Sequence, residues 1–299
     1  MKTHSFLHST WCKNLALGLV SAAFVATSSA KAAGAPKVFR VTAAAANTSG
    51  SILTIDNPAL NGKPTLRLIV TQYFTGVYNP HAVGVNYNVT LKKWQIFNED
   101  NADLPVNANF NVMIAPTAKR VSVTPTNSHG VLAFFPTQKG NAAANLLVTH
   151  LANPVLTLDS VIQPNNVSLY YIPATGPARP YSGRWSIYQD NTEANIAAVY
   201  NVADVTNLKV AKTPISFRHS AVDANTTDLE TTITNPLTDG KPDAVLFIQH
   251  VFTPTAAENV DEVLGVRYAD GKWKILTQDQ TDKLSPADFN VVAFPAVTP

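Results

Sequence analysis

Trp94-Gln95-Ile96-Phe97-Asn98-Glu99-Asp100, with Phe110-Asn111-Val112 starting ten residues after Asp100, is the stretch that decides the fold of this 299-residue chain. The same pair of segments occurs twice more in altered wording. The two further copies read Trp185-Ser186-Ile187-Tyr188-Gln189-Asp190 with Tyr200-Asn201-Val202, and Trp273-Lys274-Ile275-Leu276-Thr277-Gln278-Asp279 with Phe289-Asn290-Val291. A pattern that returns along the chain marks repeated structural units. The sequence therefore predicts three copies of one unit.

Shorter markers extend each copy toward its N-terminal side. An arginine and an asparagine stand seven residues apart in every copy, as Arg40 and Asn47, Arg120 and Asn127, and Arg218 and Asn225. The stretch Asn57–Pro64 returns as Asn235–Pro242, and both are turn-forming because Pro fixes φ and Gly accepts positive φ. The middle copy has lost this wording. From these markers we assign repeats 1, 2 and 3 to residues 38–116, 117–208 and 215–294. Residues 1–32, which precede the repeats, are assigned to a signal segment.

Hydrophobic patterning predicts that each repeat consists of strands. The run Val245–Ile248 is apolar at consecutive positions, which is typical of a strand buried on both faces. In the following Trp segment, alternation puts Trp94 and Ile96 on one face and their neighbours on the other. We expect about five strands per repeat, no helix, and a Pro- and Gly-rich loop at residues 173–183 of repeat 2.

The predicted fold is all-β, with three tandem β-sandwich-like repeats. Each repeat is small for a domain without cysteines, so we expect it to bury surface against its neighbours. The alternative is one closed assembly with threefold pseudosymmetry, either a barrel or a propeller.

These motifs carry a resemblance to a known family. The succession Asn-Pro-x-x-Asn-Gly-x-Pro, apolar strand, Gly-Val-x-Tyr, Trp-x-Ile-Phe-Asn-x-Asp and Phe-Asn-Val resembles an uncharacterised tandem-repeat β domain of secreted bacterial proteins. The resemblance covers about residues 38–294 and is stronger in repeats 1 and 3 than in repeat 2. It implies a secreted tandem β protein, and it brings no activity and no catalytic residues.

The N-terminal segment predicts export. Lys2 and Lys13 precede an apolar run at residues 15–26, and small residues follow it. This is the pattern of a secretory signal, with cleavage expected after Ala30 or Ala32. The apolar run is too short to span a bilayer, and no later run is longer. We therefore expect a secreted or periplasmic protein without a transmembrane segment.

Charge and cysteine content exclude other classes. The chain carries a formal charge of +2, but cleavage after Ala32 would remove three lysines and no acid, which leaves 19 positive against 20 negative residues, a formal charge of −1. A nucleic-acid partner is not expected, because such binding needs a basic surface. The single cysteine, Cys12, lies in the signal segment, so the mature chain forms no disulfide.

The tryptophans Trp94, Trp185 and Trp273 are candidates for two roles. A tryptophan two residues before an isoleucine on a strand is usually part of the core, because large aromatic side chains dominate cores. If these side chains were exposed, each repeat would present one platform for a sugar ring.

The aspartates Asp100, Asp190 and Asp279 stand ten residues before the Phe-Asn-Val strand in all three copies. An aspartate just past a strand commonly accepts hydrogen bonds from turn amides. The functional alternative is a repeated ligand-binding acid. Calcium needs six to eight oxygens, and only repeat 1, at residues 98–103, offers several, so no calcium site is predicted.

Gln72, His150 and His250 occupy matching positions at the end of the apolar strand. If the repeats met around a pseudo-threefold axis, these side chains could converge on a metal, since imidazole is its usual ligand. Glutamine is a poor third ligand. We therefore predict no metal and no cofactor.

Catalytic signatures are missing from the sequence. It contains no Gly-x-Ser-x-Gly, no His-Glu-x-x-His, no cysteine nucleophile in the mature chain and no phosphate-binding glycine loop. Three near-equal copies favour multivalent contact, in which linked weak sites gain avidity. The predicted function is an exported, non-catalytic binding or surface-interaction protein for a glycan or a protein. The alternative is a secreted hydrolase whose site lies in repeat 2 and uses Asp190 or Glu193, with the 173–183 loop as a wall.

Overall fold

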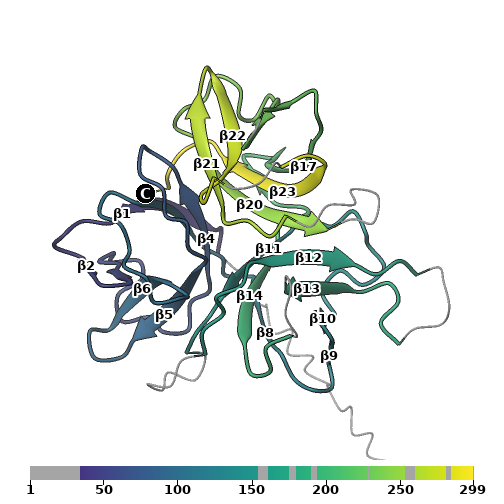
Figure 1. The fold of residues 1–299 in the computed structure, drawn as a ribbon, viewed down its shortest axis with the longest axis horizontal. Coiled ribbons are helices and arrows are strands. Elements are labelled where there is room, and N and C mark those ends of the chain that lie inside the picture. Colours follow the sequence, from purple (N-terminus) through teal and green to yellow (C-terminus); the bar gives the residue numbers. More distant parts are fainter. Residues whose placement is uncertain are drawn as a thin grey trace, which may run out of the picture. The chain divides into compact units, whose positions relative to one another are not determined.

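The computed structural model describes residues 34–153, 161–174, 180–189, 194–227, 229–252, 260–280 and 284–298 (Figure 1). The predicted signal segment 1–32 and the middle of the predicted loop 173–183 lie outside these residues. Every helix or strand element in the described ranges is a strand, so the all-β prediction is confirmed. The same ranges contain no helix of the length and apolarity that a membrane crossing requires.

Repeat 1, drawn in purple and blue in Figure 1, folds as a β-sandwich of two antiparallel sheets. The three-stranded sheet has the order β1 (Lys37–Thr42), β7 (Asn109–Ile114), β4 (Leu68–Tyr73), and the four-stranded sheet has the order β2 (Thr48–Ser49), β3 (Ile52–Thr54), β6 (Lys93–Asn98), β5 (Val83–Asn88). Trp94 and Leu53 from the second sheet share one buried cluster with Phe110 and Val112 from the first.

Repeats 2 and 3 copy this arrangement. In repeat 2 the three-stranded sheet has the order β8 (Lys119–Ser122), β14 (Val199–Asp204), β11 (Leu146–His150). Its four-stranded sheet has the order β9 (Ser128–His129), β10 (Leu132–Phe135), β13 (Trp185–Gln189), β12 (Val167–Tyr171). The sheets of repeat 3 are β17 (Ser216–Ala221), β23 (Ala287–Phe294), β20 (Val245–Phe252) and β18 (Thr226–Thr227), β19 (Glu230–Ile233), β22 (Lys272–Thr277), β21 (Leu264–Ala269). The hairpin of β15 (Lys209–Val210) and β16 (Thr213–Pro214) joins them. The expectation of about five strands per repeat was too low, because short strands such as β2 pair beside tight turns.

The three tryptophans lie in the cores of the three sandwiches. Trp94, Trp185 and Trp273 are each 0% exposed and belong to three separate buried clusters. Each indole Nε1 donates to a backbone carbonyl in the turn before the apolar strand, at 2.9–3.0 Å. Each ring therefore fills the core and also closes a turn. Truncation of a buried aromatic to alanine commonly costs about 3–5 kcal/mol.

The arginine–asparagine spacing also has a structural basis. The asparagine of each pair, Asn47, Asn127 or Asn225, closes the turn after the first strand of its repeat. Its side chain accepts from a backbone amide three residues earlier and donates to a backbone carbonyl five residues earlier. Such local bonds are what asparagine commonly makes in turns.

The sandwiches join one another in a cycle of parallel strand contacts. β4 of repeat 1 pairs with β21 of repeat 3, and β20 of repeat 3 pairs with β12 of repeat 2. The cycle closes where Val85 on β5 of repeat 1 forms a parallel bridge with Leu151 of repeat 2. At the two strand pairings the three-stranded sheet of one repeat continues into the four-stranded sheet of another, whereas at the single bridge the sheets β11-β14-β8 and β2-β3-β6-β5 remain separate. The predicted tandem sandwiches are thus confirmed, and the described strands form no closed barrel.

The repeated Phe-Asn-Val and arginine motifs hold these contacts together. The amides of Asn111, Asn201 and Asn290, all 0% exposed, donate to backbone carbonyls of the neighbouring repeat. The acceptors are Leu246 O at 2.9 Å, Leu68 O at 3.1 Å and Leu146 O at 2.9 Å, in that order. The guanidinium groups opposite them on the edge strands reach the same neighbours, as Arg40 to Ala244 O, Arg120 to Pro64 O and Arg218 to Ala144 O.

Between the sandwiches lies a fourth buried cluster. It contains one residue from near the start of each apolar strand, Ile69, Leu147 and Phe247, together with other apolar side chains of all three repeats. The C-terminal segment returns to the same region, because Thr298 N donates to Val38 O at 2.8 Å and Val38 N donates to Thr298 Oγ1 at 2.7 Å. The last described residue therefore pairs with the first strand.

The asparagine contacts give a first prediction. Asn290→Ala would leave the buried Leu146 carbonyl without its donor from repeat 3, so we expect a loss of about 1–3 kcal/mol in the free energy of unfolding. Chemical denaturation followed by tryptophan fluorescence measures it. Asn207→Ala is the matched control, since Asn207 is exposed and its removal should change the stability by less than about 0.5 kcal/mol. Equal losses in both variants would contradict the assigned role.

Candidate functional site

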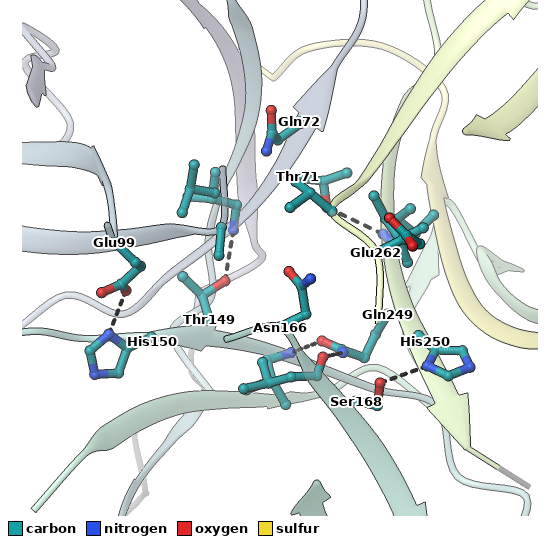
Figure 2. Close-up of a pocket in the computed structure, with 18 of the residues that line it drawn as sticks. Thr71, Gln72, Glu99, Thr149, His150, Asn166, Ser168, Gln249, His250 and Glu262 are labelled. Carbon is teal, nitrogen blue, oxygen red and sulfur yellow. Dashed lines mark hydrogen bonds and ion pairs between the residues drawn. The ribbon is translucent and has the colours of Figure 1, made fainter. Parts of the chain in front are cut away.

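A polar pocket lies where the three repeats meet (Figure 2). Its volume is about 120 Å³, and its described lining comes from all three repeats. Three matched sets of residues from the apolar strands take part in the lining: Val70, Val148 and Ile248; Thr71, Thr149 and Gln249; and Gln72, His150 and His250. Residues of the segments that lead into β5, β12 and β21 complete it, among them Ala82, Asn166 and Val263.

A ring of three hydrogen bonds joins the apolar strands at this pocket. Val70 N donates to Thr149 Oγ1 at 3.0 Å, Val148 N donates to Gln249 Oε1 at 3.1 Å, and Ile248 N donates to Thr71 Oγ1 at 3.3 Å. Each repeat thus gives one backbone amide and one side-chain oxygen. The acceptors are at most 7% exposed, so these bonds satisfy backbone amides among largely buried side chains.

The next residues of the three strands have different partners, and two of the three are bound by a neighbouring repeat. His150 Nδ1 lies 2.6 Å from Glu99 Oε1 of repeat 1, with the two side chains 3% and 1% exposed. His250 Nδ1 hydrogen-bonds Ser168 Oγ of repeat 2 at 2.6 Å (Figure 2). Gln72, at the same position of repeat 1, donates instead to His81 O of its own repeat.

Glycine occupies the two strand positions over which the side chains of Glu99 and Gln278 pass. A Cβ at Gly84 would overlap the Glu99 carboxylate, and a Cβ at Gly265 would overlap the Gln278 amide. Both side chains use this passage to reach the adjacent repeat, and Gln278 Oε1 accepts from Asn79 N at 3.1 Å. Repeat 2 has Ser168 at the matching position, and its hydroxyl makes the contact directly.

The electrostatic environment is acidic to neutral. The described lining includes two carboxylates, Glu99 and Glu262, and contains no lysine or arginine. Glu99 is held by two partners, His150 and the backbone amide of Gln163 at 2.7 Å. Burial lowers the pKa of His250 to about 4, with a small opposing effect of the Asp288 charge. His250 is therefore a neutral ring near neutral pH.

Several polar groups of the pocket have bonding capacity left over. The hydroxyls of Thr71 and Thr149 accept from the ring amides, so each still has a proton to donate. The Asn166 amide has no hydrogen-bond partner among the described residues. Figure 2 shows this amide in the middle of the pocket, with Thr149 and Gln249 beside it. These groups are able to bind a molecule that enters the pocket.

The structure places the predicted tryptophan sites away from this pocket. Trp94, Trp185 and Trp273 have no exposed ring face, so in this structure they cannot serve as platforms for sugar rings. The core role weighed against that hypothesis accounts for them, because a strand residue that faces the opposite sheet is covered by it.

The predicted acidic sites are not gathered in the structure. Asp100 is exposed, accepts from Ala102 N at 3.0 Å and lies 2.6 Å from His81 Nδ1. Asp279 is half-buried at the end of β22, and Asp190 lies outside the described residues together with Glu193. The hydrolase hypothesis for repeat 2 therefore stays a prediction.

Gln72, His150 and His250 do come to the same junction, but they share no ligand position. His150 and His250 pack against aromatic rings of their own repeats, Tyr200 and Phe289. No group of three or more His, Cys, Asp or Glu in the described ranges has the geometry of a metal site. Alternation along the strand explains the arrangement, because the preceding residues, Thr71, Thr149 and Gln249, form the ring.

The fold and the site together define an all-β protein of three tandem sandwiches with a polar pocket at their junction. A scan against family models matches one family three times along the chain, at residues 21–114, 84–175 and 179–293. The chain belongs to this family, which is described as a domain of unknown function, DUF7452. Comparisons with curated proteins and with solved structures gave no match.

The buried histidines give a prediction for pH. Burial lowers the pKa values of His219 and His250 from 6.5 to about 4. Between these values the unfolded chain takes up protons that the folded chain does not, so stability should fall as the pH falls from about 6.5 to 4. His250→Gln, which copies Gln72, should make the fall shallower. Denaturation at several pH values measures this, and an unchanged slope would count against His250 as a contributor.

The glycine passage gives another prediction. Gly84→Ala should reduce the free energy of unfolding by about 1–3 kcal/mol, because the new methyl group displaces the Glu99 carboxylate. In a Glu99→Ala background the same substitution should cost less, since its main obstacle is gone. A double-mutant cycle by chemical denaturation tests this coupling. Strictly additive losses would show that Glu99 does not need the passage.

Proposed function

We propose that this protein is an exported, non-catalytic binding protein that takes one small polar ligand in the pocket at the junction of the repeats. The observation that carries the proposal is the half-buried Asn166 amide group of the lining, which has no partner among the described residues and lies beside Thr149, whose hydroxyl has a proton to donate. Polar groups in such a place are normally satisfied by a partner, by water or by a ligand.

The distribution of shared and unshared residues supports a site at the junction. The residues that all three repeats share already have roles in the fold: the tryptophans fill cores, one asparagine closes a turn, and the other joins neighbouring repeats. The lining is where the repeats differ, as at Gln72, His150 and His250. A binding function does not require three equal sites, and convergent polar groups in a pocket are the usual form of a small-molecule site.

Two features support export as part of this proposal. The N-terminal order of basic, apolar and small residues is that of a cleaved secretory signal. The mature chain without cysteines would be indifferent to an oxidising compartment. We propose a secreted or periplasmic protein of bacterial origin, in line with the repeat motif. The exported protein would then bind its ligand in one pocket, and not on three tryptophan platforms.

The experiment that tests the proposed function measures binding to the mature protein. Ligand-observed NMR with mixtures of small uncharged, cationic and anionic metabolites should identify at least one bound compound. Asn166→Leu should weaken its binding at least tenfold, because it replaces the free amide with an apolar group and narrows the pocket.

The matched control is Asn207→Leu, an exposed asparagine outside the pocket, which should leave binding unchanged. Circular dichroism and thermal denaturation would verify that both variants are folded. Binding that survives Asn166→Leu in a folded protein would place the ligand elsewhere and reject the pocket.

A further inference from the structure

We propose that the ligand of the pocket is an uncharged polyhydroxy compound of about the size of a monosaccharide. This inference rests on the proposed function and adds the chemical class of the ligand. It follows from the hydrogen-bond capacity, the charge, the size and the composition of the lining.

The free hydrogen-bonding groups fit a ligand rich in hydroxyl oxygens. Thr71 Oγ1 and Thr149 Oγ1 each accept a backbone amide, so the capacity that remains includes an O–H donor on each. The Asn166 side-chain amide offers two N–H donors and a carbonyl acceptor. Gln72 donates its amide nitrogen to His81 O, which leaves its carbonyl oxygen as an acceptor. Hydroxyl groups both donate and accept, and so they match this mixture.

The charge of the lining opposes an anion. Glu99 and Glu262 are the acidic side chains of the described lining, and that lining contains no lysine or arginine. A carboxylate or phosphate ligand would lose its hydration without gaining a cationic partner. A cation fits less well than a neutral compound, because the Glu99 carboxylate that would attract it is already held by His150 and Gln163.

The size and the absence of aromatic rings narrow the class further. A volume of about 120 Å³ corresponds to about eight to twelve water-sized positions, close to the number of non-hydrogen atoms in a hexose. The described lining contains no phenylalanine, tyrosine or tryptophan. The ligand is therefore held by hydrogen bonds and not by stacking on an aromatic side chain.

Calorimetric titration of the mature protein with compounds matched in size tests the ligand class. The probes are D-glucose, D-galactose and D-mannitol as neutral compounds, D-glucosamine as a cation, D-glucuronate as an anion, and calcium chloride. We expect at least one neutral compound to bind at least tenfold more tightly than every charged probe. Asn166→Ala should weaken that binding at least tenfold. Asn207→Ala, at an exposed position outside the pocket, should preserve it.

The outcomes separate this inference from the proposed function. Preferred binding of D-glucosamine, D-glucuronate or calcium that is lost in Asn166→Ala would overturn the ligand class and leave the pocket as the site. Binding of a neutral compound that Asn166→Ala does not change would overturn the site. If none of the probes binds, and the metabolite mixtures also give no ligand, the pocket holds only water and both proposals fail.

Discussion

The structure depends on three backbone amides that no repeat can satisfy by itself. Val70, Val148 and Ile248 lie on apolar strands that meet at the junction, and the side chains that accept their amides are at most 7% exposed. Each amide donates to a side chain of a neighbouring repeat, in one direction around the junction. A buried amide without a partner is costly, so each sandwich is completed by the next one. The fold is in this sense a single unit, although its sequence is a repeat.

The sequence predicts the parts of the structure that local patterns encode. Consecutive apolar residues indicate strands that are buried on both faces. The recurring tryptophan, on the same strand face as the isoleucine two residues later, indicates one core per repeat. The contacts between repeats are not encoded in this way. Asn111 donates to Leu246, which lies 135 residues further along the chain, and the motif Phe-Asn-Val reveals only that this asparagine recurs. Which carbonyl it contacts depends on how the three sandwiches pack against one another.

The candidate site was harder to predict for a related reason. Repetition draws attention to the residues that the copies share, and those residues stabilise the fold. The pocket is lined by matched positions with different residues, such as Thr149 and Gln249. The signal that could have revealed them is the presence of polar side chains at the end of otherwise apolar strands, at the same step in every copy. Asn166 has no counterpart of the same type and could be recognised only from the structure.

The pairing of Thr298 with Val38 has a consequence for how such a protein can be connected. The two ends of the described chain meet on one strand, while the contacts between sandwiches run in a cycle. The covalent order of the modules is then only one of three possible cuts through the same circle. A gene rearranged to start at the second or third module would encode the same set of neighbours. The order of the modules along the chain can therefore change, whereas the contacts at the junction must be kept.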